Sequence, residues 1–323
     1  MNILSSAPHI HSGMTVSRLM RQVVLALLPA LLLGVFLFGE QALTLIFASL
    51  VAGLTTEWLC QKCQQHPLGN LMDNSALVTI LLLVMSLPPH FPWQLGALGS
   101  AIAIIFGKQV YGGLGQNLFN PAMLARVVLL ISFPVEMTDW PAPEPILPLF
   151  NSLNAAIDGY TGATTLGAMM ETGQHLTTPM FPFLLGINPG SLGESPLLLA
   201  LAGLWMIHKK IIDWRISFSV IIGCLLPACL AWQLAPETAL SPLSQLASGG
   251  LLLTAFFIAT DPVTSPTTSK GRFYYGLGCG GLIFVIRFFG AYPEGAAFAV
   301  LLMNAVSPLI ESTTKQRAYG ECK

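Results

Sequence analysis

Two threonines separated by the two smallest residues stand in the middle of the chain, within Asp158-Gly159-Tyr160-Thr161-Gly162-Ala163-Thr164-Thr165. Because its neighbours are small, the hydroxyl of Thr164 could be reached by a bulky nucleotide and by the enzyme that attaches it. The segment 166–171 could begin a helix, whose free N–H groups would stabilise a phosphodiester anion. The alternative is a threonine that caps this helix, and on spacing alone the capping turn is favoured.

The chain around this motif has the composition of a membrane protein. Hydrophobic residues make up 54% and charged residues only 9% of its 323 residues, whereas soluble domains are about 25% charged. A nearly neutral chain also lacks the field that attracts nucleic acid, which excludes that class of partner. We therefore expect an all-α polytopic membrane protein with about ten transmembrane helices. The predicted segments are 23–38, 42–59, 75–87, 93–106, 118–133, 196–207, 216–234, 246–259, 274–289 and 295–310.

The positive charges predict how these segments are oriented. If ten spans alternate in direction, one side receives Arg18, Arg21, Lys62, Lys108, Lys209, Lys210, Arg215, Lys270, Arg272, Lys315, Arg317 and Lys323. Cytoplasmic loops of membrane proteins carry an excess of Lys and Arg, so this side is the cytoplasm. Both termini are then cytoplasmic and the motif lies outside. The motif belongs to a loop, 134–195, that has no Lys or Arg. This loop is far longer than an ordinary connection of up to ~15 residues, and such a length favours a functional role.

The order of helices and breaks indicates an internal duplication. Residues 75–125 and 250–306 both contain a short apolar helix, a proline break, a Gly-rich helix, a second break and another apolar helix. With five spans in each half, the repeats must be inverted. The predicted organisation is a first repeat, 1–133, the external loop, 134–195, and a second repeat with a cytoplasmic tail, 196–323. Inverted repeats often place a binding site at their interface, but a doubled architecture that binds nothing explains the pattern equally well.

Two arginines fall inside predicted spans. Arg126 and Arg287 are intramembrane charges, which are costly and often functional; Arg126 could hold a flavin or a carboxylate. The simpler interpretation is that both side chains reach the membrane interface from near a helix end. The acids Asp213, Asp261, Glu294 and Glu311 could likewise mark an ion pathway, although interfacial carboxylates are more common.

The remaining reactive residues do not form a familiar centre. Cys60 and Cys63 make only half of a four-ligand metal site, so we expect free thiols and no metal. No arrangement of residues resembles a hydrolytic triad, and no catalytic residue is predicted.

Over essentially its whole length the chain resembles the NqrB/RnfD family, which comprises the D subunit of the Rnf (Rsx) complex and, more distantly, the B subunit of the sodium-translocating NADH:quinone oxidoreductase. The motifs that carry the resemblance are Asn117-Leu118-Phe119-Asn120-Pro121-Ala122, Asp158-x-x-Thr161-Gly162-Ala163-Thr164 and Gly190-Ser191-Leu192-Gly193-Glu194. The resemblance implies that Thr164 carries FMN through a phosphoester bond installed by a periplasmic flavin transferase. Thr165 stands where proline often follows in the family and is a second possible acceptor. A noncovalent riboflavin or other second flavin is left open.

The resemblance also implies a role for the whole chain. It would be a multi-pass subunit of the bacterial inner membrane that relays electrons beside subunits A, B, C, E and G of the Rnf complex, while the complex translocates Na⁺ or H⁺. The oxidoreductase reaction would belong to the assembly, with the redox chemistry on the flavin ring. The alternative function is a channel or secondary transporter that uses the inverted repeats without a redox cofactor.

Overall fold

The computed structural model describes residues 15–64, 73–141, 143, 180–235, 239–290 and 294–314. Within these ranges all regular secondary structure is helical, so the predicted all-α class is confirmed for the described part of the chain. Three helices are long and apolar enough to cross a membrane, namely α1 (Val16–Cys63), α10 (Trp214–Leu234) and α14 (Ala296–Thr313). These helices agree with a polytopic membrane protein, whereas the number of ten spans remains a prediction.

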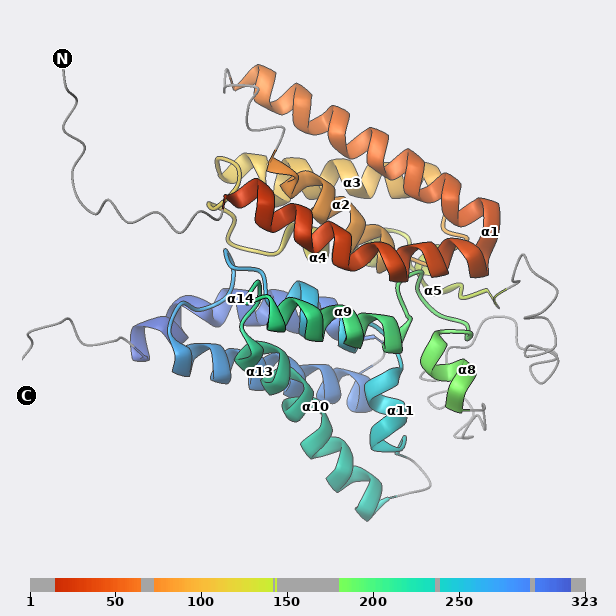
Figure 1. Ribbon diagram of the computed structural model, residues 1–323, viewed down its shortest axis with the longest axis vertical. Helices are drawn as coiled ribbons and strands as arrows, with labels where there is room; N and C mark the ends of the chain where they lie inside the picture. The colour runs from red at the N-terminus through yellow and green to blue at the C-terminus, as the bar shows by residue number, and fades with distance from the viewer. Residues whose placement is uncertain are drawn as a thin grey trace, which may run out of the picture.

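The first helix, α1, consists of two arms joined by a bend. At Gly39 the backbone has φ 71° and ψ −144°, a conformation that only glycine adopts without strain, and the chain reverses its direction there (Figure 1). The arms contain the predicted segments 23–38 and 42–59. Three shorter helices follow, α2 (Ser75–Met85), α3 (Trp93–Gly107) and α4 (Pro121–Ser132), with the single turns η2 (Gln109–Tyr111) and α5 (Pro134–Thr138) beside them.

The later helices are α8 (Met180–Leu185), α9 (Pro196–His208), α10, α13 (Ser269–Phe289) and α14. Between α10 and α13 the structure differs from the predicted continuous segment 246–259. The chain forms α11 (Pro242–Ala247), leaves the helix at residues 248–250, and resumes as α12 (Leu251–Leu253), which runs into a π-helix, η3 (Thr254–Ile258). Ser248-Gly249-Gly250 explains the interruption, because glycine and serine are poor helix formers. The break frees backbone carbonyls to accept hydrogen bonds from side chains.

The helices form two groups, α1 to α4 and α9 to α14, which lie one above the other in Figure 1. Within the groups α1 packs against α3 and α10 packs against α13; between them α4 meets α14 and α1 meets α9. Gly276 and Gly280, four residues apart on α13, allow the closest packing. A Cβ atom at Gly276 would lie 2.6 Å from that of Ser219, and one at Gly280 would overlap the carbonyl oxygen of Val220. Small residues at this spacing are typical of helix contacts in membranes.

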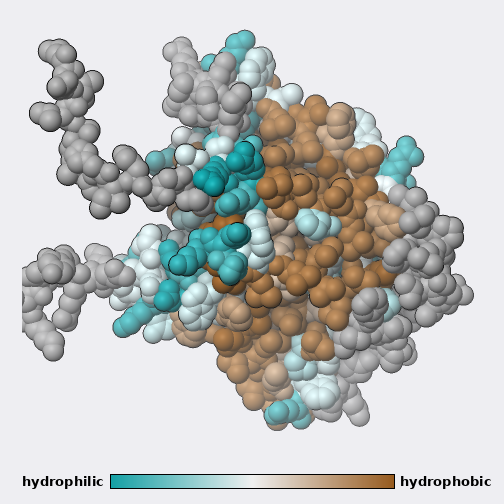
Figure 2. All heavy atoms as spheres, in the orientation of Figure 1, coloured by the Kyte–Doolittle hydropathy of each residue, from teal (hydrophilic) through white to brown (hydrophobic). Residues whose placement is uncertain are grey.

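Large apolar side chains cover the outside of the molecule. Figure 2 shows them across the middle of the visible face, with hydrophilic residues gathered at its left edge. That edge is the end at which α1 begins and α14 finishes, opposite the Gly39 bend and α11 (Figure 1). Exposed residues of this kind include Leu32, Phe47, Leu226, Leu230, Phe289 and Leu309. So much exposed apolar area is expected of a surface in contact with lipid.

Candidate functional site

The external motif lies outside the described residues. Asp158, Thr161, Gly162, Ala163 and Thr164 all fall between residues 143 and 180. Flavin attachment at Thr164 therefore remains a prediction. The sites that the structure does describe lie within the two groups of helices and where these groups meet.

A cavity separates the two groups at the end where α1 begins. Its volume is about 750 Å³, including the part open to solvent, and α1, α2, α4, α9 and η3 supply its walls. Most of the lining is apolar, with Phe256 and Phe257 as the aromatic members. The polar lining residues are Ser75, Thr79, Lys108, Asn117, Asn120, Thr260 and Asp261. A concave site with a largely apolar lining and a few polar groups is the usual form of a cofactor or ligand site.

Asn120 fixes one wall of the cavity. Its side-chain oxygen caps α4 by accepting from the backbone N–H groups of Ala122 (3.1 Å) and Met123 (3.3 Å). The side-chain Nδ2 donates to the carbonyl oxygen of Ile258 at 3.4 Å, at the end of η3. Asn120 thus connects the first group of helices to the second at the cavity.

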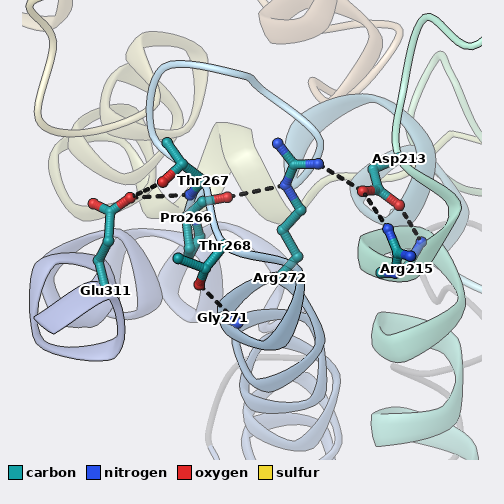
Figure 3. A network of polar contacts seen from close by, with 8 residues as sticks. All are labelled: Asp213, Arg215, Pro266, Thr267, Thr268, Gly271, Arg272 and Glu311. Atoms are coloured by element: carbon teal, nitrogen blue, oxygen red, sulfur yellow. Dashed lines mark hydrogen bonds and ion pairs between the residues drawn. The ribbon is translucent and has the colours of Figure 1, made fainter. Parts of the chain in front are cut away.

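A polar network holds the loop that borders the cavity, as Figure 3 shows. Arg272 donates from Nε to the carbonyl oxygen of Pro266 (3.1 Å) and from Nη1 to Asp213 Oδ2 (2.6 Å). Glu311 accepts from the backbone N–H of Thr267 (3.1 Å) and from its hydroxyl. Burial would raise the pKa of Asp213, but the hydrogen bonds from Arg215 and Arg272 lower it below its usual value. The carboxylate therefore stays ionised and fastens the loop to α10 and α13.

Lys108 lies beside the same cavity and is buried, only 3% exposed. Its Nζ pairs with Glu57 and donates to Ser75 Oγ at 2.5 Å. Gln109 Nε2 donates to the same Glu57 oxygen at 3.4 Å. Sequence reasoning groups Lys108 with the cytoplasmic charges and gives Glu57 no role. The one signal for the pair was an acid within the apolar segment 42–59, because a charge buried there needs a partner.

The two intramembrane arginines are buried inside the protein. Arg126 and Arg287 are 5% and 4% exposed, so neither reaches out to an interface. Arg126 Nη2 pairs with Glu294 Oε2 across the two groups of helices. Arg287 donates to the carbonyl oxygens of Gln245 (2.8 Å) and Ser248 (2.9 Å), which the break after α11 makes available. Arg126 is thus paired with a carboxylate of the protein itself, and its contact with a flavin remains a prediction.

The segment Gly190-Ser191-Leu192-Gly193-Glu194 lies between the two groups, close to this ion pair. The backbone N–H of Leu192 donates to Leu87 O (3.1 Å), and that of Gly193 donates to Met85 O (2.8 Å). These bonds place the carboxyl group of Glu194 against that of Glu294. The pKa of Glu194 is raised to about 8, mainly by burial and secondly by the nearby Glu294 carboxylate. In the sequence this segment contributes to the family resemblance, but the pattern alone assigns Glu194 no role.

The sequence was also compared with known proteins. Residues 3–320 match the NQR2, RnfD, RnfE family. Three similar proteins are each named as the D subunit of an ion-translocating oxidoreductase complex. The protein of Halorhodospira halophila is 43% identical, with 100% of this chain and 97% of the relative covered. That of Stutzerimonas stutzeri is 45% identical (95% and 92% covered), and that of Escherichia coli strain SE11 is 41% identical (99% of both).

Proposed function

Because the chain belongs to the NQR2, RnfD, RnfE family, we propose that it is a membrane subunit of an ion-translocating oxidoreductase complex. It carries covalently bound FMN and relays electrons while the complex translocates Na⁺ or H⁺. The observation that carries the flavin is the Thr161-Gly162-Ala163-Thr164 sequence within a chain that matches the family from end to end. FMN is held by a phosphoester bond on Thr164, and the other subunits, A, B, C, E and G, supply its electron donors and acceptors.

The proposed topology has ten spans in two inverted repeats. It is supported by equivalent packing in the two groups. The second arm of α1 corresponds to α10, and each packs against a later Gly-containing helix of its own group, α3 or α13. The helix ends bearing Arg18, Lys62, Lys209 and Arg272 belong to one side of this topology, which we assign to the cytoplasm. The motif then faces the periplasm, where a flavin transferase would modify it, and the membrane is the bacterial inner membrane.

The cavity between the two groups is the site that we propose for a second, noncovalent flavin such as riboflavin. The aromatic side chains of Phe256 and Phe257 offer apolar contact to a ring system, and Asn117, Asn120 and Thr260 offer polar atoms at its edge. When bound, the flavin supplies one- and two-electron redox chemistry. The apolar lining would enclose the ring, and Asn120, whose side chain is anchored to α4 and to η3, would give it a fixed polar contact.

The buried charges provide polar positions for ion movement. Lys108, which is paired with Glu57, lines the cavity, and Arg126 pairs with Glu294 across the two groups. Ionisable groups inside membrane proteins often belong to ion or proton pathways.

In-gel fluorescence tests this proposal. Wild-type protein purified from a host with the flavin transferase and denatured in SDS should give a fluorescent flavin band, because a covalent flavin survives denaturation. Thr164→Ala should abolish the band, and the matched variant Thr165→Ala should retain it. Loss of the band in Thr165→Ala alone would move the acceptor by one residue. A dark wild-type band would refute the covalent flavin and favour a channel or transporter.

A further inference from the structure

Two carboxyl groups lie in contact where the two groups of helices meet, on the side of the molecule opposite the cavity; Glu294 is buried and Glu194 is partly exposed. Glu194 comes from the segment before α9, and Glu294 from the residues before α14. The two side chains are within hydrogen-bonding contact of each other. Glu294 is nine-tenths buried, with its side chain 8% exposed. Two ionised carboxylates at such a distance repel strongly in a poorly solvated site, so one proton between them is favoured.

Their hydrogen bonds show which oxygen lacks a donor. Glu194 Oε1 accepts from the backbone N–H (2.9 Å) and the hydroxyl (2.8 Å) of Ser191. Glu294 Oε2 is paired with Arg126. Glu294 Oε1, in contrast, is fully buried and receives no hydrogen bond from the described residues. A buried acceptor without a donor is unfavourable by about 1–3 kcal/mol or more, and a proton on Glu194 would supply the donor that is missing.

The charges around the pair agree with one bound proton. Arg126 from α4 and Arg287 from α13 are the cations that act on Glu294, and Arg126 is in direct contact with it. Arg287 directs its two Nη atoms to carbonyl oxygens, as described above. A protonated Glu194 beside an ionised Glu294 leaves Arg126 balanced by a single negative charge.

We propose that Glu194 and Glu294 form a proton-binding site at the junction of the two groups of helices. Glu194 carries the proton on Oε2 and donates it to Glu294 Oε1, while Arg126 keeps Glu294 ionised. The raised pKa of Glu194 supports this assignment. The physiological use of the site, as a station for translocated protons, rests on the proposed function. Binding of the proton is a property of this chain alone.

The geometry favours a proton over Na⁺ at this position. A hard metal cation prefers several oxygen ligands, whereas Glu294 Oε2 is already occupied by a guanidinium group that would repel it. A proton needs only the contact between two oxygens.

Infrared spectroscopy of the purified complex tests the proposal through the carbonyl stretch of protonated carboxyl groups. We expect a band that disappears in one step as the pH is raised through about 8. Glu194→Gln should remove this step, and Glu40→Gln, which changes an exposed carboxylate, should leave it unchanged. In Glu294→Gln the step should move to lower pH, because Glu194 then ionises without a neighbouring negative charge.

Two results would overturn the proposal. One is a spectrum in which Glu194→Gln removes no step; the other is Na⁺ binding that is lost in Glu194→Gln while the parent shows no protonated carboxyl group. The measurement is repeated in Thr164→Ala, where the step is expected to persist. Failure of the proton site therefore cannot be confused with failure of the flavin assignment.

Discussion

Gly280 of α13 lies directly against the carbonyl oxygen of Val220 in α10, so that these two helices touch backbone to backbone. Gly281, the next residue, has only the carbonyl oxygen of Gly223 near its Cβ position, at 3.9 Å. Neighbouring glycines on one helix thus differ completely in the space around them. Packing in the second group of helices depends on Gly280 and not on Gly281.

Gly280→Ala should destabilise the protein, because its methyl group would force α10 and α13 apart. Overpacking of this kind costs about 1–3 kcal/mol. The matched control Gly281→Ala should be neutral or slightly stabilising, since alanine has the higher helix propensity. Thermal unfolding of the purified protein in detergent measures both variants, and an equal effect of the two would contradict the backbone contact.

Arg126→Met should be strongly destabilising, because it leaves the buried Glu294 carboxylate without its cation. Breaking one side of a buried pair typically costs about 3–5 kcal/mol. Arg126→Met combined with Glu294→Gln should recover part of this loss. Arg215→Met is the control: its side chain is 42% exposed in its pair with Asp213, and exposed pairs contribute at most about 1 kcal/mol. Denaturation midpoints that are equal for Arg126→Met and Arg215→Met would argue against the buried pair.

Stability should fall as the pH rises through the range in which Glu194 ionises. The pKa of Glu194 is about 8 in the folded protein against a usual value of 4.5, so between these values the folded state holds more protons than the unfolded state. The free energy of unfolding therefore decreases with pH in this window and levels off above it. Melting temperatures measured across the window should depend less on pH in Glu194→Gln than in the parent. A slope that Glu194→Gln leaves unchanged would refute the raised pKa.

Asn120→Asp should reduce the amount of noncovalent flavin while keeping α4 intact. Aspartate retains the oxygen that caps the helix but lacks the Nδ2 donor that reaches Ile258 O, and it adds a charge to the cavity wall. The effect is measured as the amount of flavin that denaturation releases, after the released flavin is separated from the flavin that stays bound to the protein. The fluorescent band of covalent flavin on the SDS-denatured protein should remain. Asn188→Asp, outside the cavity, is the control. An equal loss of noncovalent flavin in both variants would contradict the assignment of the second flavin to this cavity.

The apolar segments and their breaks could be predicted from the sequence, because both are local properties. The arms of α1 and the turn between them follow from apolar runs interrupted by Gly39-Glu40. The interruption at residues 248–250 escaped prediction since its flanks are apolar enough to suggest one helix. Its carbonyls are satisfied by Arg287, about forty residues away.

Partners of buried charges could not be predicted, because they depend on tertiary packing. Lys108 and Glu57 are 51 residues apart, and Arg126 and Glu294 are 168 apart. The positive-inside rule sorts charges by loop and cannot tell an exposed lysine from one that is folded back into the protein. For the same reason Arg126 was recognised as unusual while its carboxylate partner was not identified.

The short helix of α12 and η3 separates the two polar regions of the molecule. It extends from the break bound by Arg287 to the Ile258 carbonyl bound by Asn120, and its eight residues, 251–258, rise only about 12 Å. The hydrocarbon core of a bilayer is about 30 Å thick. Polar groups from both sides thus approach within less than half of that thickness.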